Sequence, residues 1–245
     1  MLTEDEIYRL KQAIVATVAS PLIGSIEDYT WEAIFHYVKD ISLADPALGR
    51  SKLLYDAVDP ATSTGWSLKS LQVNKKADFS VGTIYSYVIQ RADVIKKATE
   101  LGFPGLNENS LPEELGEAIV RHWNQKVEKD SLKQEVEASY EGILLKKIHG
   151  TEYIYCEYPL GQLDQSFFSW AWTVNKKNGK TGVGLQGSIN GQAQLIWYKN
   201  QKQLFRFRVI PETAVPIRIE RVRLTPTYYV SAILSALRDK NEEIS

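Results

Sequence analysis

The stretch Asp56-Ala57-Val58-Asp59-Pro60, followed after a short polar turn by Trp66-Ser67-Leu68-Lys69-Ser70, decides how this chain is interpreted. Residues 53–58 and 66–73 are rich in apolar and aromatic side chains, and the turn at 61–65 separates them. This pattern predicts two strands of a hairpin, or two neighbours in one sheet. Asp56 and Lys69 then lie on adjacent strands, so a carboxylate and an ammonium group are expected side by side.

Length and composition are those of an ordinary globular chain. The 245 residues are 44% hydrophobic and 24% charged, enough for one large domain or two small ones with a sizeable core. No apolar run approaches the ~20 residues that cross a bilayer. The first six residues are acidic rather than basic and apolar, so we expect no secretory signal. Cys156 is the only cysteine, which excludes an internal disulfide and favours a cytoplasmic location.

Charge is unevenly distributed although the net charge is only −1. Residues 98–164 carry thirteen acids and six bases, a net −7, whereas residues 165–223 carry ten bases and two acids, a net +8. A segregated field of this size can orient a polyanion. The alternative is that lysine and arginine occupy outward strand positions for solubility.

The order of expected elements predicts a mixed α/β (α+β) fold. Helical periodicity predicts helices at 4–19, up to Lys39, from Ser80 to Leu101, from Ser110 to about Tyr140, and at 228–237. Residues 85–89 fit a strand as an alternative. From Gly142 the texture changes to a meander of strands, with tight turns at Asn178-Gly179 and Asn190-Gly191. We therefore expect a helical and catalytic-core region at 1–141 and a β-rich region with a C-terminal helix at 142–245, integrated into one domain.

The two strings Asp56-Ala57-Val58-Asp59 and Ser67-Leu68-Lys69-Ser70 resemble the core motif of the PD-(D/E)XK nuclease superfamily, as found in type II restriction endonucleases. The local likeness is closest to the PvuII type, in which Asp-Ala-Val-Asp precedes Glu-Leu-Lys-Ser. The resemblance covers about fifteen residues. It implies a restriction-endonuclease-like mixed sheet flanked by helices, a β-rich C-terminal recognition region, and Mg²⁺-dependent cleavage of double-stranded DNA at a short specific sequence.

The resemblance also implies residue roles. Asp56 would give a carboxylate and Leu68 a backbone carbonyl to Mg²⁺, and Lys69 would position the attacking water or stabilise developing negative charge. Ser67 stands where the family expects an acid. Glu32 or Asp78 can supply the missing carboxylate, and Glu32 is favoured. The alternative for Asp56 and Lys69 is a surface ion pair, worth under ~1 kcal/mol.

DNA recognition is expected from basic and amide side chains, because arginine and amide groups on a β ribbon can read base edges while lysines neutralise phosphates. The candidates are Lys75, Lys76, Lys176, Lys177, Lys180, Gln186, Asn190, Gln192, Arg206, Arg208, Arg221 and Arg223. A palindromic target predicts a homodimer, and a restriction system predicts a cognate DNA methyltransferase as genetic partner. The open alternatives are a non-enzymatic β-rich module that binds DNA or carbohydrate, and a repair or junction-resolving nuclease of the same fold.

Overall fold

The chain folds as a mixed α+β protein with two sheets flanked by helices. The computed structural model describes residues 1–42, 53–73, 78–147, 150–174, 179 and 181–244. Contacts divide the chain into two compact units: unit 1 (Met1–Ala77, Tyr140–Tyr158 and Thr213–Ser245) and unit 2 (Asp78–Ser139 and Pro159–Glu212). Within the described ranges, no helix combines the length and apolar character needed to span a bilayer.

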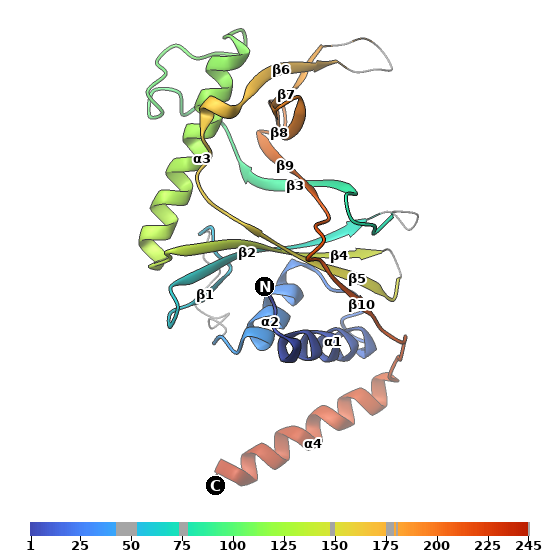
Figure 1. Ribbon diagram of the computed structural model, residues 1–245. Coiled ribbons are helices and arrows are strands. Elements are labelled where there is room, and N and C mark those ends of the chain that lie inside the picture. The colour runs from blue at the N-terminus through green and yellow to red at the C-terminus, as the bar shows by residue number, and fades with distance from the viewer. Residues whose placement is uncertain (43–52, 74–77, 148–149, 175–178, 180, 245) are drawn as a thin grey trace. The chain divides into compact units, whose positions relative to one another are not determined.

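Unit 1 is built on a five-stranded sheet in the order β1-β2-β4-β5-β10. The strands are β1 (Ala57–Asp59), β2 (Thr64–Val73), β4 (Ala138–Lys147), β5 (Glu152–Pro159) and β10 (Val215–Arg218). Helices α1 (Glu4–Ala19) and α2 (Asp28–Lys39) cover one face of this sheet (Figure 1). Helix α4 (Pro226–Ile244) belongs to the same unit. The expected helices at 4–19 and up to Lys39 and the expected hairpin are confirmed, although the first strand is only three residues long.

The core of unit 1 lies between the two helices and the sheet. Helix α1 begins at a capping box in which Thr3 and Glu6 bond each other's backbone N–H groups, and it buries Leu10. From α2, Trp31 and Phe35 are fully buried against the helix-facing side chains of β2. The indole of Trp31 also donates a hydrogen bond of 3.2 Å to the carbonyl oxygen of Gly142 on β4, which fixes α2 across the sheet.

Strands β2 and β4 run parallel, because their neighbouring side chains advance in the same direction. Trp66 stacks on Tyr140 with ring centroids 6.3 Å apart, and Leu68 lies against Gly142. Trp66 and Leu68 face the helices. Since side chains alternate along a strand, Ser67 and Lys69 start from the opposite face.

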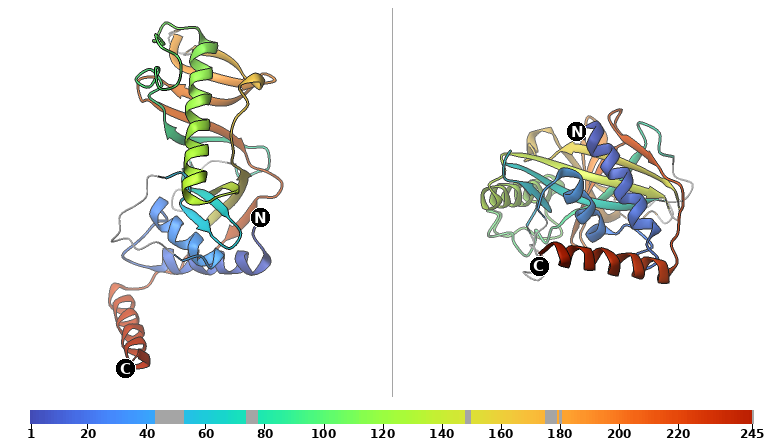
Figure 2. Two further views of the ribbon diagram at one scale, coloured as in Figure 1. Left: turned by 90° about the vertical axis from the view of Figure 1, so that its left-hand side faces the viewer. Right: turned by 90° about the horizontal axis from the view of Figure 1, so that it is seen from below.

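Unit 2 contains a meander of four consecutive strands, and a strand from earlier in the chain pairs with the last of them. Its sheet has the order β3-β9-β8-β7-β6, formed by β3 (Ile84–Arg91), β9 (Gln203–Val209), β8 (Gln192–Tyr198), β7 (Thr181–Ile189) and β6 (Ser169–Val174). The short 3-10 turn η2 (Gln165–Phe167) precedes β6. The sheet packs against α3 (Pro112–Gln134), which passes beside its strands in Figure 2. Asn190 and Gly191 have φ angles of 49° and 76° in the β7–β8 turn, as expected, whereas the other expected turn lies partly outside the described residues.

One expected helix is wrong, and the alternative strand at 85–89 is confirmed. The long helix from Ser80 to Leu101 is instead β3 followed by turns, because the aromatic and β-branched residues at 84–89 pair with β9. Their spacing also fits a helix, and only the sheet partner distinguishes the two structures. Each of the two units that the contacts define gathers segments from both sides of residue 142.

Gly116→Ala is expected to destabilise unit 2 by about 1–3 kcal/mol, because overpacking forces neighbours to shift. A Cβ at Gly116 in α3 would overlap the indole ring of Trp170, which is also packed against Gly187. Urea unfolding followed by tryptophan fluorescence would measure the loss. Gly161→Ala is the matched control, because a Cβ there has no neighbouring atom within 4 Å. Equal stability of the two variants would contradict this account of the packing.

Candidate active site

The candidate site lies along the edge of β2 where its partner strand ends. Strand β1 pairs with residues 64–66 of β2, and the N–H of Asp56 still donates a 2.8 Å bond to the carbonyl oxygen of Trp66. The next two N–H groups that point to this edge are bonded by carboxylates rather than by a strand. The N–H of Leu68 donates to Asp56 Oδ2 at 2.7 Å, and the N–H of Ser70 donates to Asp28 Oδ1 at 2.9 Å. Two carboxylates are thereby fixed two residues apart along one strand edge.

Lys69 joins this group from the same strand. Its Nζ donates a 2.7 Å bond to the carbonyl oxygen of Leu68 and lies 3.7 Å from Asp56 Oδ2. The expected meeting of Asp56 and Lys69 is therefore present, while a catalytic role stays a prediction. The carbonyl of Leu68 points to the same edge as its N–H, because both groups of one residue point the same way in a strand. Leu68 O thus lies among the Lys69 ammonium and the carboxylates of Asp56 and Asp28.

Burial and charge act in opposite directions on Asp56. Desolvation raises the pKa of its carboxyl group above the ordinary value, and the positive charge of Lys69 and the hydrogen bond from Leu68 N–H oppose that rise. The negative charge of Asp28 raises the pKa of Asp56 further, which shows that the two carboxylates are close enough to interact. A site that holds two acids in this way favours the arrival of a cation.

The acid bonded to the strand edge beside Asp56 is Asp28, which precedes the favoured Glu32 by four residues in α2. Ser67, at the position where the resemblance expects an acid, is only 6% exposed. Glu32 is half-buried one turn further along the same face of α2. Asp78 belongs to unit 2, where its carboxylate accepts bonds from the N–H and hydroxyl of Ser80. The i, i+4 spacing of Asp28 and Glu32 was the available signal, because it places both acids on one helical face.

Glu141 is a second carboxylate that sequence reasoning did not single out. The pairing of Trp66 with Tyr140 and of Leu68 with Gly142 places Glu141 beside Ser67, on the sheet face that points away from the helices. Glu141 is 2% exposed. An acid on the neighbouring strand thus lies next to Ser67, the position where the resemblance expects an acid.

His36 supports the backbone of the site. Its Nε2 lies 3.1 Å from the carbonyl oxygen of Asp56, and its Nδ1 lies 3.3 Å from that of Ile41. The ring is buried under the sheet at the end of α2, so it holds the start of β1 in place. Sequence reasoning missed this role because the three histidines are scattered and form no metal-spaced pair.

The donor set fits a hard cation. Two carboxylates and one carbonyl oxygen are the ligand types that Mg²⁺ accepts, and this ion usually keeps several waters in addition. Among the described residues no group of three or more His, Cys, Asp and Glu side chains is arranged to hold a metal. A cation here would therefore depend on the carbonyl of Leu68 and on water as well as on Asp56 and Asp28.

Asp59, by contrast, is the last residue of β1, and its carboxylate binds the turn that follows. Its carboxylate accepts a 2.9 Å bond from the N–H of Ala61 and a 2.7 Å bond from the hydroxyl of Thr62. Both partners lie in the β1–β2 turn. Asp59 consequently offers a control for the charge of Asp56 within the same hairpin.

The expected DNA-contacting residues that the structure describes are divided between the two units. Gln186, Asn190 and Gln192 lie at the β7–β8 hairpin of unit 2, where Asn190 and Gln192 are exposed. Arg221 and Arg223 are exposed in unit 1. Lys75, Lys76, Lys176, Lys177 and Lys180 lie outside the described residues.

Arg206 was expected to contact DNA, but it is buried. It is 5% exposed, and its guanidinium stacks on the indole of Trp123 with 4.9 Å between the guanidinium carbon and the ring centroid. Arg208, two residues along β9, donates a 3.3 Å bond to the carbonyl oxygen of Pro159. The two arginines start from the same face of β9, because side chains alternate along a strand, and at Arg206 that face packs against Trp123 of α3. Arg206 therefore has a packing role in unit 2.

Comparison with known proteins gives no relative: no family model matches the chain, and neither a curated protein nor a solved structure matches it significantly.

Asp56→Asn is expected to raise the melting temperature at pH 7, by roughly 1–3 °C for a chain of this size. The folded-state pKa of Asp56 is raised, so the folded state binds more protons than the unfolded state as pH increases above about 3.9. Its contribution to stability is therefore greatest at low pH and declines as pH rises through the folded pKa. The asparagine variant avoids that decline and still accepts the bond from Leu68 N–H.

Differential scanning calorimetry of both proteins across pH would measure this effect, and the difference between them should shrink on acidification. Added Mg²⁺ should stabilise the wild-type protein and leave Asp56→Asn unchanged. A variant that is less stable than wild type at pH 7 would contradict the electrostatic account.

Proposed function

We propose that this protein is a Mg²⁺-dependent nuclease that cleaves double-stranded DNA at a short specific sequence, with a restriction-endonuclease-like core in unit 1. The observation that carries the proposal is the group of Asp56, Leu68 O, Lys69 and Asp28 at the open edge of β2. A chance surface ion pair needs neither the second carboxylate nor the carbonyl oxygen between them.

The chemistry follows from the positions of these groups. Mg²⁺, when bound, supplies charge neutralisation for the phosphoryl oxygens and acidifies water. Asp56 and Asp28 bind and orient the ion, and Leu68 contributes its carbonyl oxygen. Lys69 keeps its ammonium beside the same oxygens, where it can orient the attacking water or stabilise the negative charge that develops on the phosphate. His36 acts as a positioning residue through the backbone of Asp56.

The local fold supports the same reading. Helix α2 precedes the hairpin β1–β2 and covers the sheet that carries the site, and β4 then adds parallel to β2 after the long insertion that contains α3. The resemblance implies a mixed sheet flanked by helices, and the position of α2 on the sheet that carries the site is consistent with that expectation. Unit 2, with its exposed Asn190 and Gln192 at a hairpin tip, supplies side chains able to read base edges.

Lys69→Ala is expected to lower the rate of plasmid cleavage by at least about 10²-fold, the usual cost of losing one electrostatic contact to a transition state. Asp28→Asn should cost at least about tenfold and raise the Mg²⁺ concentration needed for half-maximal rate, because one charged ligand is lost. Asp59→Asn is the matched control and should cleave as wild type does.

Plasmids of diverse sequence incubated with Mg²⁺ should give discrete bands that EDTA abolishes. Absence of cleavage across many sequences, or full activity of Lys69→Ala, would contradict the proposal. A preference for branched over linear duplex would instead indicate a junction-resolving nuclease with the same core. The proposed genetic partner, a DNA methyltransferase that protects the target, can be tested by methylating the plasmid.

A homodimer is part of the proposal, because a two-fold symmetric protein matches a palindromic site. Helix α4 offers the surface: Val230, Ile233, Leu234 and Leu237 recur at helical spacing and are 44–53% exposed. We propose that the apolar face of α4 is covered by a second copy of this chain.

Ile233→Asp with Leu237→Asp is expected to convert the dimer to a monomer, since two charges on that face cannot be desolvated cheaply. Light scattering coupled to size exclusion would measure the mass. Ala232→Asp, on the opposite face of α4, should leave the dimer intact. A wild-type protein that is monomeric at all concentrations would contradict the proposal.

A further inference from the structure

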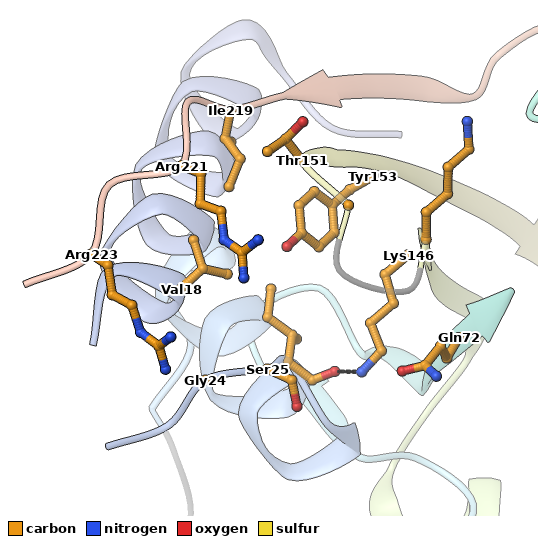
Figure 3. A pocket seen from close by; sticks show the side chains of 13 residues that line it. Val18, Gly24, Ser25, Gln72, Lys146, Thr151, Tyr153, Ile219, Arg221 and Arg223 are labelled. Atoms are coloured by element: carbon orange, nitrogen blue, oxygen red, sulfur yellow. Dashed lines mark hydrogen bonds between the residues drawn. The ribbon is translucent and has the colours of Figure 1, made fainter. Parts of the chain in front are cut away.

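A pocket of about 290 Å³ opens in unit 1, next to the candidate site but separate from its carboxylates. It lies between the end of α1, the turn before α2, the ends of β2 and β4, and the segment after β10 (Figure 3). Val18, Ile219 and the ring of Tyr153 give it an apolar wall. Ser25 and Gln72 add neutral polar groups.

The lining of this pocket is strongly cationic. Among the described residues it includes four basic side chains and no carboxylate. Two of the four have partners: Lys146 Nζ donates to the carbonyl oxygen of Ile26 and lies 3.2 Å from Glu27, and Lys147 pairs with Glu152 at 2.7 Å. The described part of the chain shows no ion pair for Arg221 or Arg223, so their charges are available to a ligand.

Backbone hydrogen bonds fix the segment that carries the two arginines. The segment that carries them is bonded at both ends, by Ile219 N–H to the carbonyl oxygen of Thr151 and by Leu224 N–H to that of Ala19, each at 3.0 Å. In Figure 3 the guanidinium groups of Arg221 and Arg223 turn toward the pocket from the same side. Two planar guanidinium groups presented together are suited to a phosphate, because each can donate two hydrogen bonds to its oxygens.

We propose that this pocket binds a phosphate group, with Arg221 and Arg223 as its principal ligands. The volume admits one phosphate with the sugar attached to it, and the apolar wall suits the sugar. The phosphate can come from the DNA backbone or from a free nucleotide. In the DNA form, the inference rests on the proposed function and assigns this pocket to a phosphate other than the one that is cleaved.

One short segment of backbone connects the pocket to the candidate site. The carbonyl oxygen of Ile26 accepts bonds from Lys146 Nζ and, at 2.9 Å, from the hydroxyl of Ser70. The N–H of Ser70 in turn donates to Asp28. A phosphate held by Arg221 therefore lies on the other side of the turn that positions Asp28. Such a contact would place the DNA backbone alongside the edge of β2.

The test measures binding in EDTA, so that cleavage plays no part. The double variant Arg221→Gln with Arg223→Gln is compared with wild type for two probes, inorganic phosphate by thermal shift and a fluorescent DNA duplex by anisotropy across salt concentrations. Arg218→Gln is the control for loss of a nearby positive charge: it removes one charge from the preceding strand, where the Arg218 side chain is 85% exposed and lies outside the pocket.

If the phosphate is that of DNA, the double variant should bind the duplex at least about tenfold more weakly, and the slope of log K against log salt should fall by about two. Arg218→Gln should change affinity no more than about threefold. If the ligand is a free phosphate, the thermal shift with inorganic phosphate is lost in the double variant while duplex affinity is unchanged. Wild-type response to both probes in the double variant, or an equal loss in Arg218→Gln, would overturn the proposal.

A second measurement uses the unaltered protein. Phenylglyoxal modification of arginines, mapped by mass spectrometry, should be slowed at Arg221 and Arg223 by inorganic phosphate and be unaffected at Arg218. Equal modification with and without phosphate would also overturn the proposal. Because neither measurement involves metal or cleavage, the phosphate site can stand if the nuclease activity fails, and it can fail if the activity is found.

Discussion

The edge of β2 carries N–H groups that need acceptors, and β1 is too short to provide them. Strand β1 ends its pairing at Trp66, and Asp56 and Asp28 then bond the N–H groups of Leu68 and Ser70. An unpaired backbone donor in a partly buried place costs free energy, so these bonds are favoured by the same physics that forms a sheet. The consequence is chemical: two carboxylates and the carbonyl oxygen of Leu68 collect at one point.

This arrangement opposes the ionisation of Asp56 in the folded protein. Burial and the neighbouring charge of Asp28 make the ionised form of Asp56 unfavourable, and the Lys69 ammonium offsets this only in part. Asp56 is half-buried beside the exposed carboxylate of Asp28, and in the function that we propose a bound cation would offset the resulting cost in folding free energy. A surface ion pair would carry no such cost.

Positive charge is likewise placed by the fold rather than by position in the chain. The basic stretch at 165–223 is divided between the two units, and its arginines have different surroundings. Arg206 stacks on Trp123 inside unit 2, whereas Arg221 and Arg223 line a pocket of unit 1 close to the turn before α2. A charge count along the chain therefore suggests that these basic residues act together, although they belong to two units. It also gives no sign of the local phosphate site that we propose.

The sequence by itself determined the features that depend on near neighbours. Helical spacing and a hairpin pattern suffice for α1, α2 and β1–β2, and adjacent strands bring Asp56 and Lys69 together. Tertiary structure decided what depends on distant partners. The residues at 84–91 become a strand because β9 pairs with them, and Asp28 joins the site because α2 packs across β2. Local patterns state which conformations a segment can adopt, and contacts between segments far apart in the chain select one of them.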